Sequence, residues 1–532
     1  MFNVNITPLE IYEKREEFGL NNSISMLTEI IDTNKEDNTR SEAIRYLGKI
    51  SNNSSTLKEQ CFETLENILI SDDGIEIKCS AAKALGKIKY LKALKPLKWI
   101  IEQESTDNEV KMASLEAIAD IQIDEPELQL FIKELGNESQ SIRDFIKENV
   151  INLKAEKLIE SLLSSLKTGN YSEKHKIEII NLVGVKLLNT NTSFNNFSKF
   201  GNDFPTIFSN LVQNKDLLLE NITNISFPDN SDLMENSLII LKTLGEEINH
   251  DLVKLLFIDN FIVKKNAIKL VGKLQLKEAV DFLFHNLDNM YSEVSIATIE
   301  TLGEIGDLSA VPELLDVLNI EDISYEYLDL DLKFYILDAI RDIYLNNKNA
   351  PYDYLYSSLK TDNDMIKESI AYILGEIVNE EFMDPLVSLL EEKNLDVRKN
   401  SIIALGKIGN VKAIDPLINI IEDANSYWLL KKVAVDAIYN IYQKNWYLIK
   451  NGRTESKKLL NRHAADLIHH LSITTDENFK VKLSLIKFLE VFGGQPALSA
   501  LLKRVNDFHR VVRIYSSNAI KKIEEQLEIE NS

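Results

Sequence analysis

Residues 397–409 read Val-Arg-Lys-Asn-Ser-Ile-Ile-Ala-Leu-Gly-Lys-Ile-Gly, and two other parts of the chain carry nearly the same pattern. Residues 294–306 read Val-Ser-Ile-Ala-Thr-Ile-Glu-Thr-Leu-Gly-Glu-Ile-Gly. Residues 77–88 read Ile-Lys-Cys-Ser-Ala-Ala-Lys-Ala-Leu-Gly-Lys-Ile. Self-similarity at a period of about 20–50 residues is the signature of a repeat architecture. We therefore analyse the chain as an array of related units.

Twelve segments align on one position, which we call the anchor: Gly48, Gly86, Ala119, Ile151, Gly272, Gly303, Arg341, Gly375, Gly406, Tyr439, Glu490 and Lys521. The residue before the anchor is always Leu, Ile or Val, and the residue two after it is always large and apolar. The residue eight before it is Lys or Arg in eleven of the twelve segments. Apolar residues at these intervals share one face of a helix.

A second apolar stretch follows the anchored helix in several units, as in Leu94–Ile100, Val311–Leu315, Asp384–Val387 and Asp415–Ile418. Proline near its start is compatible with the first turn of a helix. Each unit is therefore predicted to be two antiparallel helices. Gly306 and Gly409 suit the left-handed position that ends a helix. The anchor glycine costs about 1 kcal/mol inside a helix, so its recurrence indicates close backbone approach between neighbouring helices.

The pattern Val-Arg-x-x-Ser-Ile-x-Ala-Leu-Gly-x-Ile-Gly-Asn-x-x-Ala-Ile-x-Pro-Leu at residues 397–417 resembles the HEAT-like repeat first associated with phycobilin lyases. The resemblance implies an all-α fold, a right-handed α-solenoid of about thirteen stacked helical hairpins with the second helices on its inner surface. It is specific for fold. It does not select a function, since such repeats occur in lyases, hydroxylases, chemotaxis adaptors and scaffolds.

Composition agrees with a helical fold, because 532 residues contain only 18 glycines and 10 prolines. The formal charge of −23 argues against non-specific binding of nucleic acid or anionic membranes by the whole surface. No transmembrane segment or secretory signal is visible. Cys61 and Cys79 are expected to be small core residues. The sequence thus favours a cytoplasmic protein that binds no membrane.

The anchor spacing suggests four parts: N-terminal repeats at 1–168, degenerate repeats with an irregular Asn-rich segment at 169–250, central repeats at 251–442, and basic C-terminal repeats with an insertion at 443–532. The gap of 121 residues between Ile151 and Gly272 contains the Asn-rich segment. A hinge and an irregular but packed repeat both fit that segment.

The spacing of 51 residues between Tyr439 and Glu490 implies an insertion of about 18 residues, and insertions in solenoids often lie on the binding face. From Lys444 to Lys522 fifteen Lys and Arg face six Asp and Glu, which gives +9. This region could bind an acidic partner, or its cations could be ordinary solvated residues that balance the acidic remainder. The partner-binding candidates are Trp446, Tyr447, Lys457, Lys458, Arg462, Lys503, Arg504, Arg510 and Arg513.

The basic column eight residues before the anchor is interpreted as structural, because acidic residues two positions earlier suggest a ladder of paired charges: Glu76, Glu109, Asp331 and Asp396. His463, Asp466 and His470 could share a helical face and ligate a metal, although helices with several polar residues produce such a set by chance. No His-Glu dipeptide occurs, and the repeat-built hydroxylases require one to hold iron. No nucleotide-binding, zinc-protease or nucleophile-elbow motif occurs, so neither an enzyme nor a cofactor is expected.

The leading hypothesis is a non-enzymatic scaffold or adaptor that binds a protein partner along the solenoid surface. A bilin lyase or chaperone acting on a phycobiliprotein is the alternative, and it rests on the resemblance. Nucleic-acid binding through the basic C-terminal surface is a third hypothesis.

Overall fold

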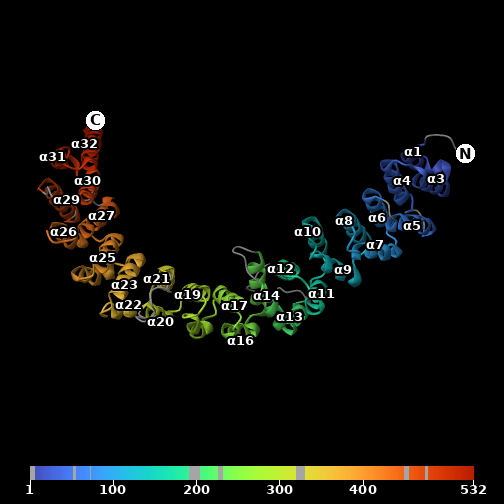
Figure 1. Ribbon diagram of the computed structural model, residues 1–532, viewed down its shortest axis with the longest axis horizontal. Helices are drawn as coiled ribbons and strands as arrows, with labels where there is room; N and C mark the ends of the chain where they lie inside the picture. Colours follow the sequence, from blue (N-terminus) through green and yellow to red (C-terminus); the bar gives the residue numbers. More distant parts are fainter. Residues whose placement is uncertain are drawn as a thin grey trace. The chain divides into compact units, whose positions relative to one another are not determined.

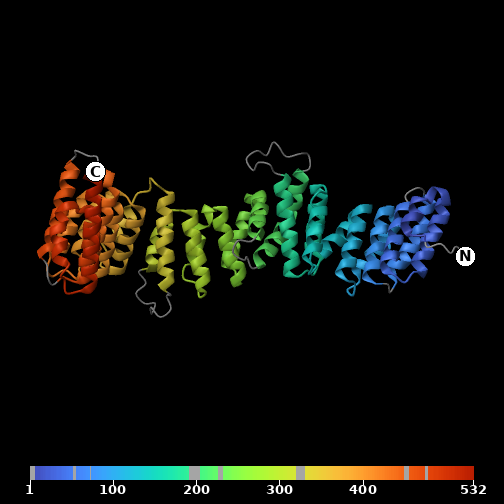
Figure 2. The ribbon, with the colours of Figure 1, turned by 90° about the horizontal axis from the view of Figure 1, so that it is seen from above.

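A computed structural model describes residues 6–51, 55–71, 74–190, 204–225, 232–318, 330–447, 455–473 and 477–531. In these ranges all regular structure is helical and no residue is in a strand. The helices of each part stand side by side in two layers (Figures 1 and 2). The prediction of an all-α solenoid is confirmed.

The chain divides into two compact units, Met1–Leu255 and Leu256–Ser532. Both are built from helical hairpins in which a first helix carries the anchor and a second helix packs beside it. The four-part division of the sequence stays a prediction.

The first unit has these helices: α1 (Pro8–Glu13), α2 (Arg15–Phe18), α3 (Leu20–Thr33), α4 (Asp37–Ile50), α5 (Ser55–Ile70), α6 (Ile75–Ile88), α7 (Leu94–Glu102), α8 (Asn108–Ile121), α9 (Glu125–Glu134), α10 (Gln140–Val150), α11 (Ala155–Thr168), α12 (Glu173–Thr190), α13 (Phe204–Gln213), α14 (Lys215–Asn224), α15 (Asp232–Leu244) and α16 (Glu246–Lys254). In Figure 1, α4, α6 and α8 form one layer, and α5, α7 and α9 form the other.

The second unit has these helices: α17 (Phe261–Leu274), α18 (Val280–Leu283), α19 (Ser292–Ile305), α20 (Ala310–Leu318), α21 (Leu330–Asn346), α22 (Asp353–Ser358), α23 (Asp364–Ile377), α24 (Met383–Ser388), α25 (Leu395–Ile408), α26 (Ile414–Glu422), α27 (Trp428–Lys444), α29 (Glu455–Ile473), α30 (Phe479–Phe492), α31 (Gly494–Arg504) and α32 (Arg510–Asn531). Short 3-10 turns lead into α18, α24 and α26. The layer of first helices runs α17, α19, α21, α23, α25, α27, α30 and α32.

The hairpin α25–α26 shows why these residues form this unit. The Asn394 side chain accepts hydrogen bonds from the amides of Asp396 and Val397, which caps the start of α25. Gly409 ends the helix at φ +82° in the left-handed region, as predicted. Asn410 then caps the turn that leads into α26. A polar cap at each start and a glycine at the end therefore define the hairpin.

The anchor glycines lie where neighbouring first helices nearly touch. A Cβ added at Gly86 would lie 2.8 Å from the Cα of Ala117 on α8, and one added at Gly406 would lie 2.8 Å from the Cα of Ala437 on α27. Real Cβ atoms essentially never approach a backbone atom this closely. The prediction of close backbone approach is confirmed, and its partner is the small residue two positions before the next anchor.

The basic column residues are held inside the repeats. The guanidinium of Arg143 donates to the carbonyl oxygens of Asn137 (2.6 Å) and Glu138 (2.9 Å), in the loop that enters its own helix. Arg40 similarly donates from Nε to the Ile31 carbonyl oxygen at 2.9 Å. These bonds satisfy carbonyls in a loop and in the last turn of α3 that would otherwise be left unpaired. The structural interpretation of this column agrees with these contacts.

Ion pairs join several residues of this column to carboxylates. Lys367 pairs with Glu392 at 2.6 Å, and Arg40 lies 3.4 Å from Asp37 on its own helix. Asp396, one of the four acidic residues of the expected ladder, pairs with Lys399 at 2.5 Å. The side chain of Asp331 lies outside the described residues, and the ladder between units stays a prediction.

The Asn-rich region is packed where it is described. Helix α12 packs directly on α15, and a Cβ added at Gly184 would lie 2.5 Å from the Cβ of Asn236. Helices α13 and α14 lie between them in sequence. Residues 191–203 and 226–231, which include much of the Asn-rich stretch, lie outside the described residues.

Both cysteines behave as expected of core residues. Cys61 is fully buried, and burial raises the pKa of its thiol to about 12. Burial also raises the pKa of Cys79, which is partly buried. Thiols with raised pKa values are poor nucleophiles, so neither residue is suited to thiolate chemistry.

We predict that Gly86→Ala destabilises the protein although alanine favours a helix. The new methyl group has to push α6 from α8, which costs about 1–3 kcal/mol and exceeds the helix-propensity gain of about 1 kcal/mol. Thermal and urea unfolding of the full chain measure the effect.

Gly74→Ser is the matched control, because Gly74 is the N-cap of the same helix and no atom lies within 4 Å of its added Cβ. Serine is a favourable N-cap, so this variant should be at least as stable as the parent. Equal stability of Gly86→Ala and the parent would contradict the role assigned to the anchor glycine.

Candidate functional site

Trp446 lies one residue beyond the C-cap of α27, where the first-helix layer of the second unit exposes aromatic side chains. Its ring centroid is 5.3 Å from that of Phe492 at the end of α30. Phe492 also contacts the rings of Tyr439 and Tyr442 on α27. Tyr447 follows Trp446 and is largely exposed. This aromatic cluster therefore continues from the core to the surface.

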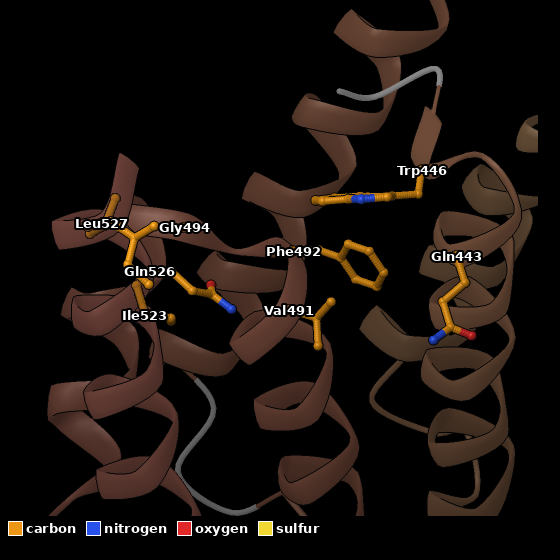
Figure 3. A pocket seen from close by; sticks show the side chains of 9 residues that line it. Gln443, Trp446, Val491, Phe492, Gly494, Ile523, Gln526 and Leu527 are labelled. Atoms are coloured by element: carbon orange, nitrogen blue, oxygen red, sulfur yellow. The ribbon is translucent and has the colours of Figure 1, made fainter. Parts of the chain in front are cut away.

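A cavity of about 800 Å³ opens beside this cluster, at the C-terminal ends of α27, α30 and α32. Figure 3 shows the Trp446 indole over Phe492, with Val491 below. Gln443 and Gln526 lie on opposite sides. The lining residues are Gln443, Trp446, Val491, Phe492, Gly494, Ile523, Gln526, Leu527 and Ile529. We call this the Trp446 cavity.

Among the described residues, the side chains that line the Trp446 cavity carry no ionisable group. Trp446, Val491 and Ile529 are exposed in a protein whose formal charge is −23. A concave surface that combines apolar side chains with polar groups is suited to binding, and tryptophan is enriched among residues that dominate binding energies. The arrangement suits an inserted apolar side chain, with the two glutamine amides available for hydrogen bonds.

Sequence analysis singled out Trp446 but missed the rest of this lining. One signal was available: the residue after the anchor is charged in most repeats, as in Lys87, Asp120, Lys273 and Glu304, but it is Val491 in α30. Residues from α32 reach the cavity only because α30 and α32 pack together. No local pattern in the sequence predicts that contact.

The basic candidates whose side chains are described do not line this cavity. Lys457 and Lys458 are on α29, and their side chains lie outside the described residues. Arg462 is exposed on the same helix. Lys503 at the end of α31 and Arg510 at the start of α32 are exposed on either side of one loop. Partner binding by these residues stays a prediction.

Arg504 and Arg513 act inside the fold. Arg504 is 6% exposed, and its Nε donates to the Leu471 carbonyl oxygen at 2.9 Å. Arg513 donates to the carbonyl oxygens of Asp507 (2.9 Å) and Phe508 (3.0 Å). The Arg504 guanidinium holds the C-terminal end of α29, and that of Arg513 holds the loop between α31 and α32. Burial of Arg504 corrects the expectation that it is available to a partner, whereas Arg513 is partly exposed.

The expected insertion is built mainly as longer helices. Helices α27 and α29 have 17 and 19 residues. The buried Tyr442 hydroxyl donates to the Leu460 carbonyl oxygen and fixes α29 against α27. Helix α29 also packs on α26 and α31, as a second helix should. Residues 448–454 lie outside the described residues.

The suggested metal ligands do not form a site. His463 is 1% exposed, with its ring nitrogens 3.5 Å from Asp415 and 3.7 Å from Asp466. Burial lowers the pKa of His463 despite these carboxylates. His470 instead lies 3.6 Å from Glu477. Across the part of the chain that is described, no cluster of three His, Cys, Asp or Glu can hold a metal.

A family model described as HEAT repeats matches residues 352–438, which span α22 to α26 and part of α27. No curated protein matches the sequence. The phycobilin-lyase subtype of the repeat stays a prediction.

Several solved structures resemble the fold at low identity. Kap95p with RanGDP is 11% identical with a TM-score of 0.39, over 94% of this chain and 76% of that chain. Importin beta is 12% identical with a TM-score of 0.36, over 97% and 64%. Kap121p bound to Pho4p is 13% identical with a TM-score of 0.36, over 96% and 55%. The chain thus spans less than two thirds of importin beta and Kap121p, and no conclusion about its partners follows from these likenesses.

Among the described helices, none is long and apolar enough to cross a membrane.

A buried ion pair joins α27 to the segment before α30. Lys431, a basic column residue, pairs with Glu477 at 3.1 Å, and both side chains are buried. Burial alone would raise the pKa of Glu477, but the neighbouring His470, Lys431 and the Asn478 amide lower it to about 2. A carboxyl whose pKa is lowered by folding stabilises the protein at pH values above its ordinary, unfolded pKa. This stabilisation is lost as the pH falls through the pKa of the folded protein.

We predict that Glu477→Gln is less stable than the parent at pH 7, since Lys431 is left buried without its counter-ion. The difference should shrink by on the order of 2–3 kcal/mol between about pH 4.5 and pH 2, as the parent carboxyl becomes protonated. Urea unfolding across this range measures it, and the exposed Glu528→Gln controls for the lost charge. A difference that does not change with pH would rule out the assigned ionisation.

Proposed function

We propose that the protein is a non-enzymatic cytoplasmic scaffold and that the Trp446 cavity is a docking site for a protein partner. The observation that carries the proposal is a cavity of about 800 Å³ whose described lining is uncharged, beside exposed aromatic residues, on an otherwise strongly acidic protein. Exposed apolar surface of this kind marks interaction sites, because leaving it in water costs free energy that binding recovers.

The cavity determines what a partner has to supply. Its lining offers aromatic and aliphatic contacts from Trp446, Phe492 and Leu527, together with the amides of Gln443 and Gln526. A large apolar side chain fits this chemistry, and a buried charge would lack a counter-ion there. The partner would therefore insert an apolar anchor.

Charge gives a second expectation about the partner. The stretch Lys444–Lys522 has a net charge of +9, and Arg462, Lys503 and Arg510 are exposed within it. Exposed cations of one sign accelerate association with an acidic partner and favour it over a basic one. These three cations are not part of the cavity lining, so we expect the Asp or Glu of the partner to lie apart from its apolar anchor.

Selection from a random peptide library tests this proposal with the full-length protein as bait. Peptides that bind the parent should share one large apolar residue. Trp446→Ala should weaken their binding at least tenfold, since tryptophan hot spots contribute about 2 kcal/mol or more. Isothermal titration calorimetry measures the affinities.

Trp99→Ala is the matched control, because Trp99 on α7 is 48% exposed and Trp446 is 42% exposed. It should leave peptide binding unchanged. Circular dichroism shows whether each variant keeps its helices. Peptides that bind Trp446→Ala as tightly as the parent would refute the docking site.

A further inference from the structure

A groove of about 630 Å³ lies between α4 and α6 in the first unit. Its lining contains four cations, Arg45, Lys49, Lys83 and Lys87, and one carboxylate, Glu42. This sign is opposite to that of the whole chain, whose formal charge is −23. The groove is therefore a local basic site that the overall composition conceals.

The four cations form a two-by-two array. Arg45 and Lys49 are four residues apart on α4, and Lys83 and Lys87 are four residues apart on α6, so each pair occupies one helical face about 6 Å apart. The two helices are held close, because a Cβ added at Gly48 would lie 3.0 Å from the Cβ of Ala84. Arg45 and Lys49 thus offer one row of positive charge to the groove, opposite the row of Lys83 and Lys87, whose ammonium groups also meet carboxylates of α8.

The next pair of helices shows what normally occupies these positions. Lys83 and Lys87 on α6 meet Glu116 (3.7 Å) and Asp120 (2.6 Å) on α8. The same kind of contact joins α17 to α19 in the second unit. Neighbouring first helices therefore form ion pairs between the residues three before the anchor and between the residues one after it. Between α4 and α6 the same columns carry only positive charge.

The cations on α4 have weak partners within the protein. Arg45 lies 3.3 Å from Glu42 and its guanidinium is 4.8 Å from the Tyr46 ring. The Lys49 ammonium is 5.1 Å from the Tyr46 ring and 5.6 Å from the Tyr12 ring. Exposed contacts of these kinds contribute about 0.2–1 kcal/mol each. An incoming anion can displace them at little cost.

We propose that the groove between α4 and α6 binds an acidic helix of a protein partner, with Asp or Glu four residues apart. Helix α8 already displays this recognition, because it presents Glu116 and Asp120 at that spacing to the cations of α6. A compact anion such as phosphate would reach only part of an array that extends one turn along two helices. The site belongs to the first unit and does not depend on the Trp446 cavity.

The test uses a fluorescent helical peptide of about 20 alanine-rich residues with Glu at i and i+4. Fluorescence anisotropy at an ionic strength of about 0.05 M, where screening is modest, gives its affinity for the full-length protein. Arg45→Gln combined with Lys49→Gln should weaken binding about tenfold, because two exposed ion pairs are lost. These substitutions leave the pairs between α6 and α8 intact.

Lys35→Gln combined with Lys95→Gln removes the same charge from exposed sites outside the array and should change the affinity less than about twofold. A peptide of identical composition with Glu at i and i+2 should bind more weakly than the first peptide. Equal losses in both double variants, equal binding of both peptides, or full competition by inorganic phosphate would each overturn the proposal. So would the absence of binding to the parent.

Discussion

The absence of a side chain at one helical position, the anchor glycine, sets the distance between neighbouring first helices. Where Gly86 and Gly406 lack a Cβ, the following first helix places an alanine directly against the glycine backbone. Glycine is unfavourable inside a helix, and here dense packing between helices offsets that cost. Because each anchor glycine meets the small residue two positions before the next anchor, the contact also fixes the register of consecutive hairpins.

Once that register is fixed, residues at the same position of successive repeats make similar contacts. The residue eight before the anchor either donates hydrogen bonds to loop carbonyls, as Arg143 does, or forms an ion pair, as Lys431 does. The residue after the anchor pairs with its equivalent on the next helix, as Lys87 does with Asp120. Candidate binding surfaces occur where the residue at a repeat position differs in chemistry from its equivalents in the other repeats. Val491 replaces a charge with an apolar side chain, and Lys49 sets a second positive charge beside Lys87.

Net charge along the sequence overstates the positive surface that a partner can reach. Between Lys444 and Lys522 the excess is +9, but Arg504 binds a carbonyl at the end of α29, Arg513 binds a loop carbonyl and Lys482 is buried against Asp507. Burying a charge requires a partner within the fold, so these cations are satisfied inside their own repeats. The Trp446 cavity, whose described lining has no ionisable group, is consequently a clearer candidate site than the basic residues of this stretch.

Local sequence patterns predict the helical class, the hairpin unit, the anchor glycines and the structural nature of the basic column, because these depend on residues within one or two helical turns. The position of Trp446 in the expected insertion also made it a partner-binding candidate. Which residues share a surface with Trp446 depends on the packing of three separate helices, which brings Val491 and Gln526 beside it. The packing of the helices likewise decides which cations are buried and which charged residues on neighbouring helices have opposite signs. Those outcomes depend on contacts between helices more than 30 residues apart in sequence, and local periodicity carries no information about them.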